Sequence, residues 1–236
     1  GGRFARIAAF SVLIGGLFFI PGKLHSEAAG SCVTNGEWRN PAAKDARRGR
    51  LDYRRLIDGL AKKPVVLLGE IHDRADHHRW QLQVIGALFG RNQNMVLGFE
   101  AFPRSVQPVL DRWTRGSLDE ETFLRQSRWH EVWRFDAGLY MPLFNFARLN
   151  RIPMIALNVD RALIDEVGEK GWAAIPASKR QGIGDPAAAE DAYFESLYQT
   201  YKSHPVVKGK TRGGKNSPAF RRFVDAQLTW DRAMAE

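Results

Sequence analysis

The sequence predicts an α/β protein with a mainly parallel sheet flanked by helices. Three apolar segments of strand length, residues 65–68, 95–99 and 152–157, each run into polar residues. A helical pattern separates the first two, and strand, helix and strand within about 35 residues are typical of a βαβ unit. With 236 residues and 44% hydrophobic content, the chain can bury one substantial core.

The amino-terminal segment has the pattern of an export signal. Arg3 and Arg6 precede an apolar run over 7–20, and small residues follow after Pro21. The run is short for a membrane span, which takes about 20 apolar residues. We therefore expect residues 1–30 to be an export signal or an amino-terminal anchor, and the protein to be exported to the cell envelope.

Cys32 is the single cysteine of the chain and follows the small residues 29–31. It could carry the lipid of a lipoprotein and so hold the protein on the cell-envelope membrane, or it could be a plain surface thiol after ordinary cleavage. The chain has no disulfide of its own in either case.

The formal charge of +9 is concentrated in two places. Residues 31–51 form a basic linker, and residues 202–215 form a basic, glycine-rich loop without an acidic residue. These are solvated faces, or contacts for anionic lipid headgroups or ligand carboxylates. Nucleic-acid binding is not indicated, because no recognition motif is present and no aromatic residues interleave with the basic ones.

The α/β domain is expected over 52–236. A helix over 52–62, which Pro64 stops, precedes the first strand, and another over 75–89 follows it. The segment of about 103–150 contains only helical patterns, with starts at Pro103, at a capping box over 117–120 and at Tyr140. We interpret it as a helical subdomain inserted after the second strand, packing over the sheet edge.

Further helices are expected after the third strand, over 161–168, 187–201 and 218–235. The last of these has the clearest start, because Ser217 can cap it and Pro218 suits its first turn.

The polar residues at the strand ends predict where the site lies. Glu70 and His72 follow the first strand, Glu100 the second and Asn158 the third. In a parallel sheet these ends share the carboxyl edge, where open α/β sheets bind their ligands. A carboxylate that closes a buried strand is costly unless it is paired or used, so Glu70 and Glu100 are the strongest candidates.

Histidine and carboxylate side chains cluster after the first strand and suit a transition metal. His72 and His78 are the candidate metal ligands. The alternative is structural: Asp73 and Asp76 cap the next helix, and His77 is exposed beside it, which is the interpretation we favour for His77. Tyr140 is either a core residue or a phenol above the sheet edge, where a tyrosinate could ligate ferric haem.

Several separate motifs together resemble a known family. They occur in the order Leu68-Gly69-Glu70-Ile71-His72-Asp73, His77-His78 with Gln81, Leu97-Gly98-Phe99-Glu100-Ala101-Phe102, Asp136-Ala137-Gly138-Leu139-Tyr140, Asn158 with Arg161, and Ala226-Gln227-Leu228-Thr229-Trp230-Asp231. Over about residues 52–235 the chain is similar to the ChaN-type haem-binding uptake lipoproteins, which are related to the TIKI proteases and erythromycin-esterase-like enzymes.

The resemblance implies an exported haem-binding protein that serves iron acquisition, and it admits a homodimer. The axial-ligand candidates that it implies are His72, His78 and Tyr140, with Glu70 or Glu100 supporting them. Asp73, Asn158 and Arg161 are the other expected haem-site residues. Family members continue past the last helix into a strand with a Gly-x-Gly-His motif that this sequence lacks, so we expect one of the polar strand ends to be missing.

Two other functions stay open at this point. In a metal-dependent hydrolase, Glu70 would be the general base while His72 and His78 hold a divalent metal and its water; no complete ligand set such as His-Glu-x-x-His supports this. In an envelope interaction protein, the site would be inactive. Haem binding is the leading hypothesis.

Overall fold

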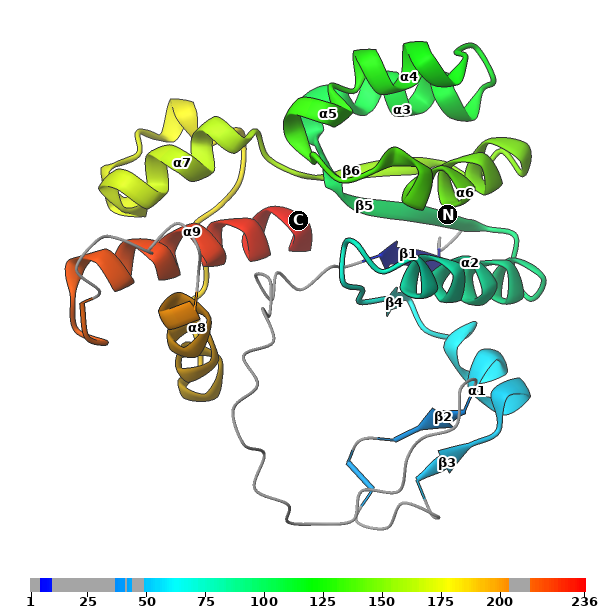
Figure 1. Ribbon diagram of the computed structural model, residues 1–236, viewed down its shortest axis with the longest axis horizontal. Helices are drawn as coiled ribbons and strands as arrows, with labels where there is room; N and C mark the ends of the chain where they lie inside the picture. Colours follow the sequence, from blue (N-terminus) through cyan, green and yellow to red (C-terminus); the bar gives the residue numbers. More distant parts are fainter. Residues whose placement is uncertain (1–4, 10–36, 41, 44–48, 204–212) are drawn as a thin grey trace.

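The computed structural model describes residues 5–9, 37–40, 42–43, 49–203 and 213–236. Its larger sheet has four strands in the order β4-β1-β5-β6, and each neighbouring pair is parallel (Figure 1). The strands are β1 Ala5–Ala9, β4 Val65–Leu67, β5 Met95–Pro103 and β6 Met154–Asn158. The predicted α/β class with a mainly parallel sheet is therefore confirmed.

Strand β1 was not expected, because it comes from the predicted export segment. It lies between β4 and β5, with Ile7 aligned between Val66 and Leu97. The other residues of that segment, Cys32 and much of the two basic stretches lie outside the described residues. A short antiparallel pair, β2 Trp38–Arg39 and β3 Arg50–Leu51, precedes α1.

Helices cover one face of the sheet more completely than the other. Helices α2 (Ala75–Phe89) and α6 (Ala137–Leu149) contact each other beside the sheet (Figure 1). Along β4, Val66 is 6% exposed while its neighbours Val65 and Leu67 are 48% and 59% exposed. Since side chains alternate across a strand, the inner face of β4 faces the core and the outer face is open.

Two helices, one before β4 and one after β5, each start directly after a capping aspartate. Asp52 caps α1 (Tyr53–Leu60) by accepting from the Arg55 N–H at 2.8 Å. Asp119 caps α4 (Glu120–Gln126) by accepting from the Thr122 N–H at 2.7 Å. The predicted capping box placed the cap two residues earlier, at Ser117, and was wrong.

The chain between β5 and β6 is helical, as expected for this segment. It forms η1 Arg104–Val106, α3 Gln107–Thr114, α4, α5 Trp129–Val132 and α6. The buried side chains of these helices join those of β4, β5 and β6 in one hydrophobic cluster that includes Trp113, Phe123, Trp129 and Phe144. Whether this segment is a separate subdomain therefore stays a prediction.

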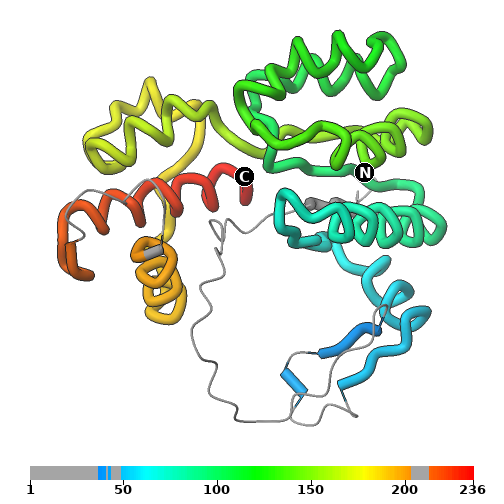
Figure 2. Tube along the Cα trace, in the orientation of Figure 1, coloured from blue at the N-terminus to red at the C-terminus, as the bar shows by residue number. Residues whose placement is uncertain are grey.

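The last part of the chain forms a second helical group, α7 Arg161–Lys170, η2 Trp172–Ala174, η3 Ala177–Lys179, α8 Asp191–Ser203 and α9 Pro218–Ala235. Figure 2 shows α7 to α9 together, away from α1 and the β2–β3 pair. Ser217 caps α9 as predicted, accepting from the Phe220 N–H. In the part of the chain that the structure describes, none of the helices has the length and apolar character of a membrane span.

Candidate functional site

The segment that leads from β4 into α2, residues 68–81, is called the β4–α2 corner below. Two side chains of α2, those of Gln81 and His78, hold the backbone of the preceding turn. The Gln81 amide donates to the Leu68 carbonyl at 2.9 Å, and the His78 Nε2 lies 3.0 Å from the His72 carbonyl oxygen. The corner is therefore fixed by hydrogen bonds within a short stretch of chain.

His77 also holds the corner, contrary to the expectation that it is simply exposed. Its Nδ1 accepts from the Ile71 N–H at 2.9 Å. Side chains of α2 thus contact the Leu68 carbonyl, the Ile71 amide and the His72 carbonyl. Nothing in the sequence pattern distinguishes a histidine that makes this bond from one that is simply exposed.

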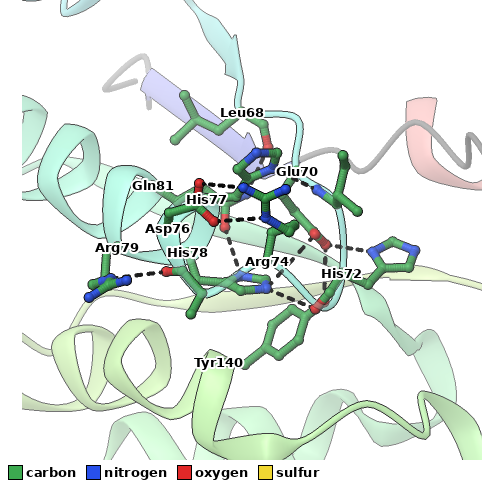
Figure 3. Close-up of polar contacts among 12 residues, drawn as sticks. Leu68, Glu70, His72, Arg74, Asp76, His77, His78, Arg79, Gln81 and Tyr140 are labelled. Carbon is green, nitrogen blue, oxygen red and sulfur yellow. Dashed lines mark hydrogen bonds and ion pairs between the residues drawn. The ribbon is translucent and has the colours of Figure 1, made fainter. Parts of the chain in front are cut away.

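Glu70 is the centre of the polar contacts at the corner (Figure 3). Its side chain is 2% exposed, and its Oε1 lies 2.6 Å from His72 Nδ1. The Tyr140 hydroxyl, which comes from α6, donates to the same oxygen at 3.0 Å. Its Oε2 lies 3.8 Å from His78 Nε2. The buried carboxylate is thus paired through Oε1, as its burial requires.

His72 lies beside Glu70 on the solvent-facing side of the site, which we call its mouth, and 16% of its side chain is exposed. Its ring packs edge-on against Trp133 and Phe135, with centroid separations of 4.6 and 4.8 Å. Its Nδ1 faces Glu70, so its Nε2 lies on the far side of the ring, which points away from the polar cluster (Figure 3). We call the aromatic residues above the corner the aromatic cover: Trp129, Trp133, Phe135, Tyr140 and Phe144.

Tyr140 is buried, with 5% of the residue exposed. Burial raises the pKa of its phenol above the ordinary value, and the negative charge of Glu70 raises that pKa further. The hydroxyl is therefore a neutral proton donor to Glu70 at physiological pH, and the tyrosinate form is strongly disfavoured.

Both ring nitrogens of His78 face oxygen atoms of the protein. Nε2 lies 3.0 Å from the His72 carbonyl and Nδ1 lies 3.3 Å from Gln81 Oε1, and the residue is 3% exposed. Within the described ranges, no group of three or more His, Cys, Asp or Glu residues is arranged to hold a metal ion. The geometry thus gives little support to His72 and His78 as a metal pair.

Glu100 lies inside strand β5 rather than at its end. The sequence predicted that the strand stops at Phe99, but it runs to Pro103, and its register with β6 shifts between those two residues. Glu100 is 4% exposed. It lines a cavity of about 20 Å³ together with Glu70, Gln81, Trp133, Tyr140 and neighbouring apolar residues.

The structure brings most of the predicted site residues together and leaves two apart. Asn158 joins the group through its side-chain amide, which donates to the Glu100 carbonyl at 3.1 Å. Asp73 is exposed on the corner. Arg161 lies at the start of α7, with a side chain that is 54% exposed and 3.8 Å from Asp165 of the same helix.

Sequence reasoning missed two contributions to the site. It did not assign Gln81 a role, although the amide holds both Leu68 and His78. It also did not predict that Trp133 and Phe135 pack against His72. The enrichment in aromatic residues was the available signal.

Taken together, these features define an α/β protein with a buried acid and tyrosine at the carboxyl edge of its sheet and a histidine presented at the mouth. The family described as "Haem-binding uptake, Tiki superfamily, ChaN" matches residues 56–236. The chain belongs to this family.

A solved structure agrees with the fold. The chain is similar to the structure described as "Cofacial heme binding to ChaN of Campylobacter jejuni", with a TM-score of 0.63 and 20% sequence identity over 85% of this chain and 74% of that one. No curated protein matches the sequence. Membership of the family supports haem as the ligand of this protein.

Proposed function

We propose that this is an exported haem-binding protein of the bacterial cell envelope that takes part in haem and iron uptake, and that it holds haem at the mouth of the site through His72. The observation that carries the proposal is the partly exposed His72 ring, which has one nitrogen on buried Glu70 and packs edge-on against Trp133 and Phe135.

The size of the cavity decides where a macrocycle can lie. A cavity of about 20 Å³ holds about one water molecule, whereas pockets for cofactors measure roughly 300 Å³ or more. Haem would therefore lie outside the cavity, against His72 at the mouth of the site. The apolar surface it needs is present there, because Trp133 and Phe135 flank His72 and Ile71 is 55% exposed. The residues present thus fit the group.

The geometry favours His72 among the three axial-ligand candidates. Bound haem supplies an iron atom that accepts an imidazole nitrogen or a tyrosinate oxygen. Both His78 nitrogens face protein oxygens, and the buried Tyr140 hydroxyl donates to Glu70 at 3.0 Å. His72 has one nitrogen on Glu70 and the other directed away from it (Figure 3).

Glu70 supports this role of His72. A carboxylate on one nitrogen of a ligating histidine fixes the proton there and leaves the other nitrogen as the electron-pair donor. The 2.6 Å contact also orients the ring. Tyr140 holds the acceptor oxygen of Glu70 in place with its hydroxyl.

Absorbance titration with haem tests the proposal. We expect the wild-type protein to shift the Soret band from that of free haem, and His72→Ala to lose the spectrum of histidine ligation and to bind haem at least tenfold more weakly. His130→Ala is the matched control, since His130 is exposed on α5. A Soret band that is the same in wild type and in free haem would remove haem binding, and one unchanged by His72→Ala would remove the ligand assignment.

Export, membrane attachment and pairing of two copies are further parts of the proposal. The family is one of haem uptake, and residues 1–30 have the composition of an export signal or anchor. Haem bound at the mouth would have one face uncovered, and the description "Cofacial heme binding" for the Campylobacter protein supports a homodimer in which two such faces would meet. Helices α3 to α6, as a subdomain over the sheet edge, would flank that interface.

Cell fractionation and labelling of Cys32 with a lipid precursor test the export and anchoring. Sedimentation with and without haem tests the homodimer. A protein that stays in the cytoplasm, or sediments as a monomer when loaded with haem, would remove the corresponding part. The metal-dependent hydrolase has less support, because His78 is engaged at both nitrogens.

A further inference from the structure

We propose that His77 is a positioning residue that sets the turn presenting His72. This inference rests on the proposed role of His72 in binding haem, and it assigns a function to His77, which lies on the first turn of α2 beside the polar cluster (Figure 3). The carrying observation is the 2.9 Å hydrogen bond from the Ile71 N–H to His77 Nδ1.

The turn that carries His72 has little packing of its own on the Ile71 side. Ile71 is 55% exposed, so burial of its side chain does not hold it. The turn closes through the Arg74 N–H, which donates to the Ile71 carbonyl at 2.9 Å. The His77 bond fixes the other polar group of Ile71. Both backbone groups of the residue directly before His72 are thereby held, and the direction in which the chain enters His72 follows from them.

His77 and His78 hold the turn from its two sides. His77 holds the Ile71 amide, while His78 holds the carbonyl of His72. The two neighbouring side chains leave the first turn of α2 and meet the corner one residue apart. Helix α2 thus acts as a rigid support that orients the backbone around His72. The 2.6 Å contact of His72 with Glu70 depends on that orientation.

The role of His77 can be tested with substitutions that keep, shift or remove its acceptor atom. A backbone N–H only donates, so His77 must present a lone pair at Nδ1. Asparagine places its carbonyl oxygen at the same distance along the side chain, whereas glutamine places it one carbon further and alanine has no acceptor. His77→Asn should therefore keep the turn, and His77→Gln and His77→Ala should release it.

Haem affinity and spectrum are measured for the three variants, with His130→Ala as the exposed-histidine control. Residues that orient a metal ligand typically contribute a factor of about 10 to affinity or more, so we expect His77→Ala to weaken haem binding about tenfold and to reduce the histidine-ligation signature. His77→Asn should remain close to wild type. In a His72→Ala background, His77→Ala should have no further effect. Equal effects of alanine with and without His72 would overturn the proposal.

Hydrogen exchange of the Ile71 amide in the haem-free protein keeps this test separate from that of haem binding. Protection that is lost in His77→Ala and kept in His77→Asn supports the positioning role whatever the haem ligand is. Protection that is the same in wild type and His77→Ala overturns it. If the amide responds as expected and His72→Ala leaves the haem spectrum unchanged, the ligand assignment fails and the role of His77 in shaping the corner stands.

Discussion

The β4–α2 corner and the aromatic cover meet at Glu70 and His72 but are held in different ways. Hydrogen bonds that fix the corner join residues no more than 13 positions apart, as between Gln81 and Leu68. The hydrogen bond from the cover to the corner, between Tyr140 and Glu70, joins residues 70 positions apart. The corner depends on single polar atoms, and the cover depends on buried area. Changes in the two regions should therefore be read with different measurements.

The largest effect is expected in the cover, from Trp129→Ala. Trp129 is fully buried, packs on Tyr140 and Phe144, and donates its indole N–H to the Phe135 carbonyl at 2.8 Å. Truncating a buried tryptophan costs about 3–5 kcal/mol in the free energy of unfolding. Urea denaturation measures it. A loss below about 1 kcal/mol would mean that the cover is not held by burial.

Glu70→Gln addresses the polar atom that the two regions share. Glutamine keeps the volume and one carbonyl oxygen, but it removes the charge that His72 and Tyr140 face. Hydrogen bonds to a charged group contribute about 2 kcal/mol, so the free energy of unfolding should fall by about that amount. The haem spectrum should change more than in Trp129→Ala. If denaturation and spectrum both stay as in wild type, the polar centre is not where the regions are joined.

Tyr140→Phe removes the hydroxyl that links the cover to the corner. This bond is made to a charged group, but His72 still faces the same oxygen, so we expect a loss of about 1.5 kcal/mol, the lower end for such bonds. Because the pKa of Tyr140 is raised in the folded protein, its contribution is present below the unfolded pKa of about 10 and is lost as the pH rises above that value. Unfolding curves from about pH 8 to about pH 11 should show a smaller alkaline loss in the variant. Equal alkaline losses would contradict the assignment.

The smallest effect is expected from Leu149→Ser, at the other end of the helix that carries Tyr140. Leu149 is 81% exposed, and surface substitutions change the free energy of unfolding by about 0.5 kcal/mol or less. The variant is a control for α6, since it alters the helix outside the cover. A loss comparable to that of Tyr140→Phe would show that the helix responds as a whole.

The sequence predicted the fold where local signals are strong. The bounds of α2 and the start of α9 follow from apolar spacing and from Ser217 with Pro218. The end of β5 was misplaced because Glu100 looks like a strand terminus, whereas buried Ala101 and Phe102 continue the strand after it. Strand β1 was missed because its residues have the composition of an export segment.

The candidate site was predicted to the extent that it lies at strand ends. Glu70 and His72 follow from the rule that parallel strands present ligands at their carboxyl edge. The link from Tyr140 to Glu70 spans 70 positions, and no periodicity reports a contact at that separation. The role of His77 depends on the orientation of one backbone amide, which composition does not encode.

The short span of the corner has a consequence for the order in which the protein matures. Closing a small loop loses little chain entropy, and structures with near neighbours in contact form fast. Residues 68–81 can therefore assemble while later parts of the polypeptide are still being synthesised. The imidazole that we assign to iron would then be oriented before the aromatic cover, which supplies the apolar surface for the macrocycle, packs against it.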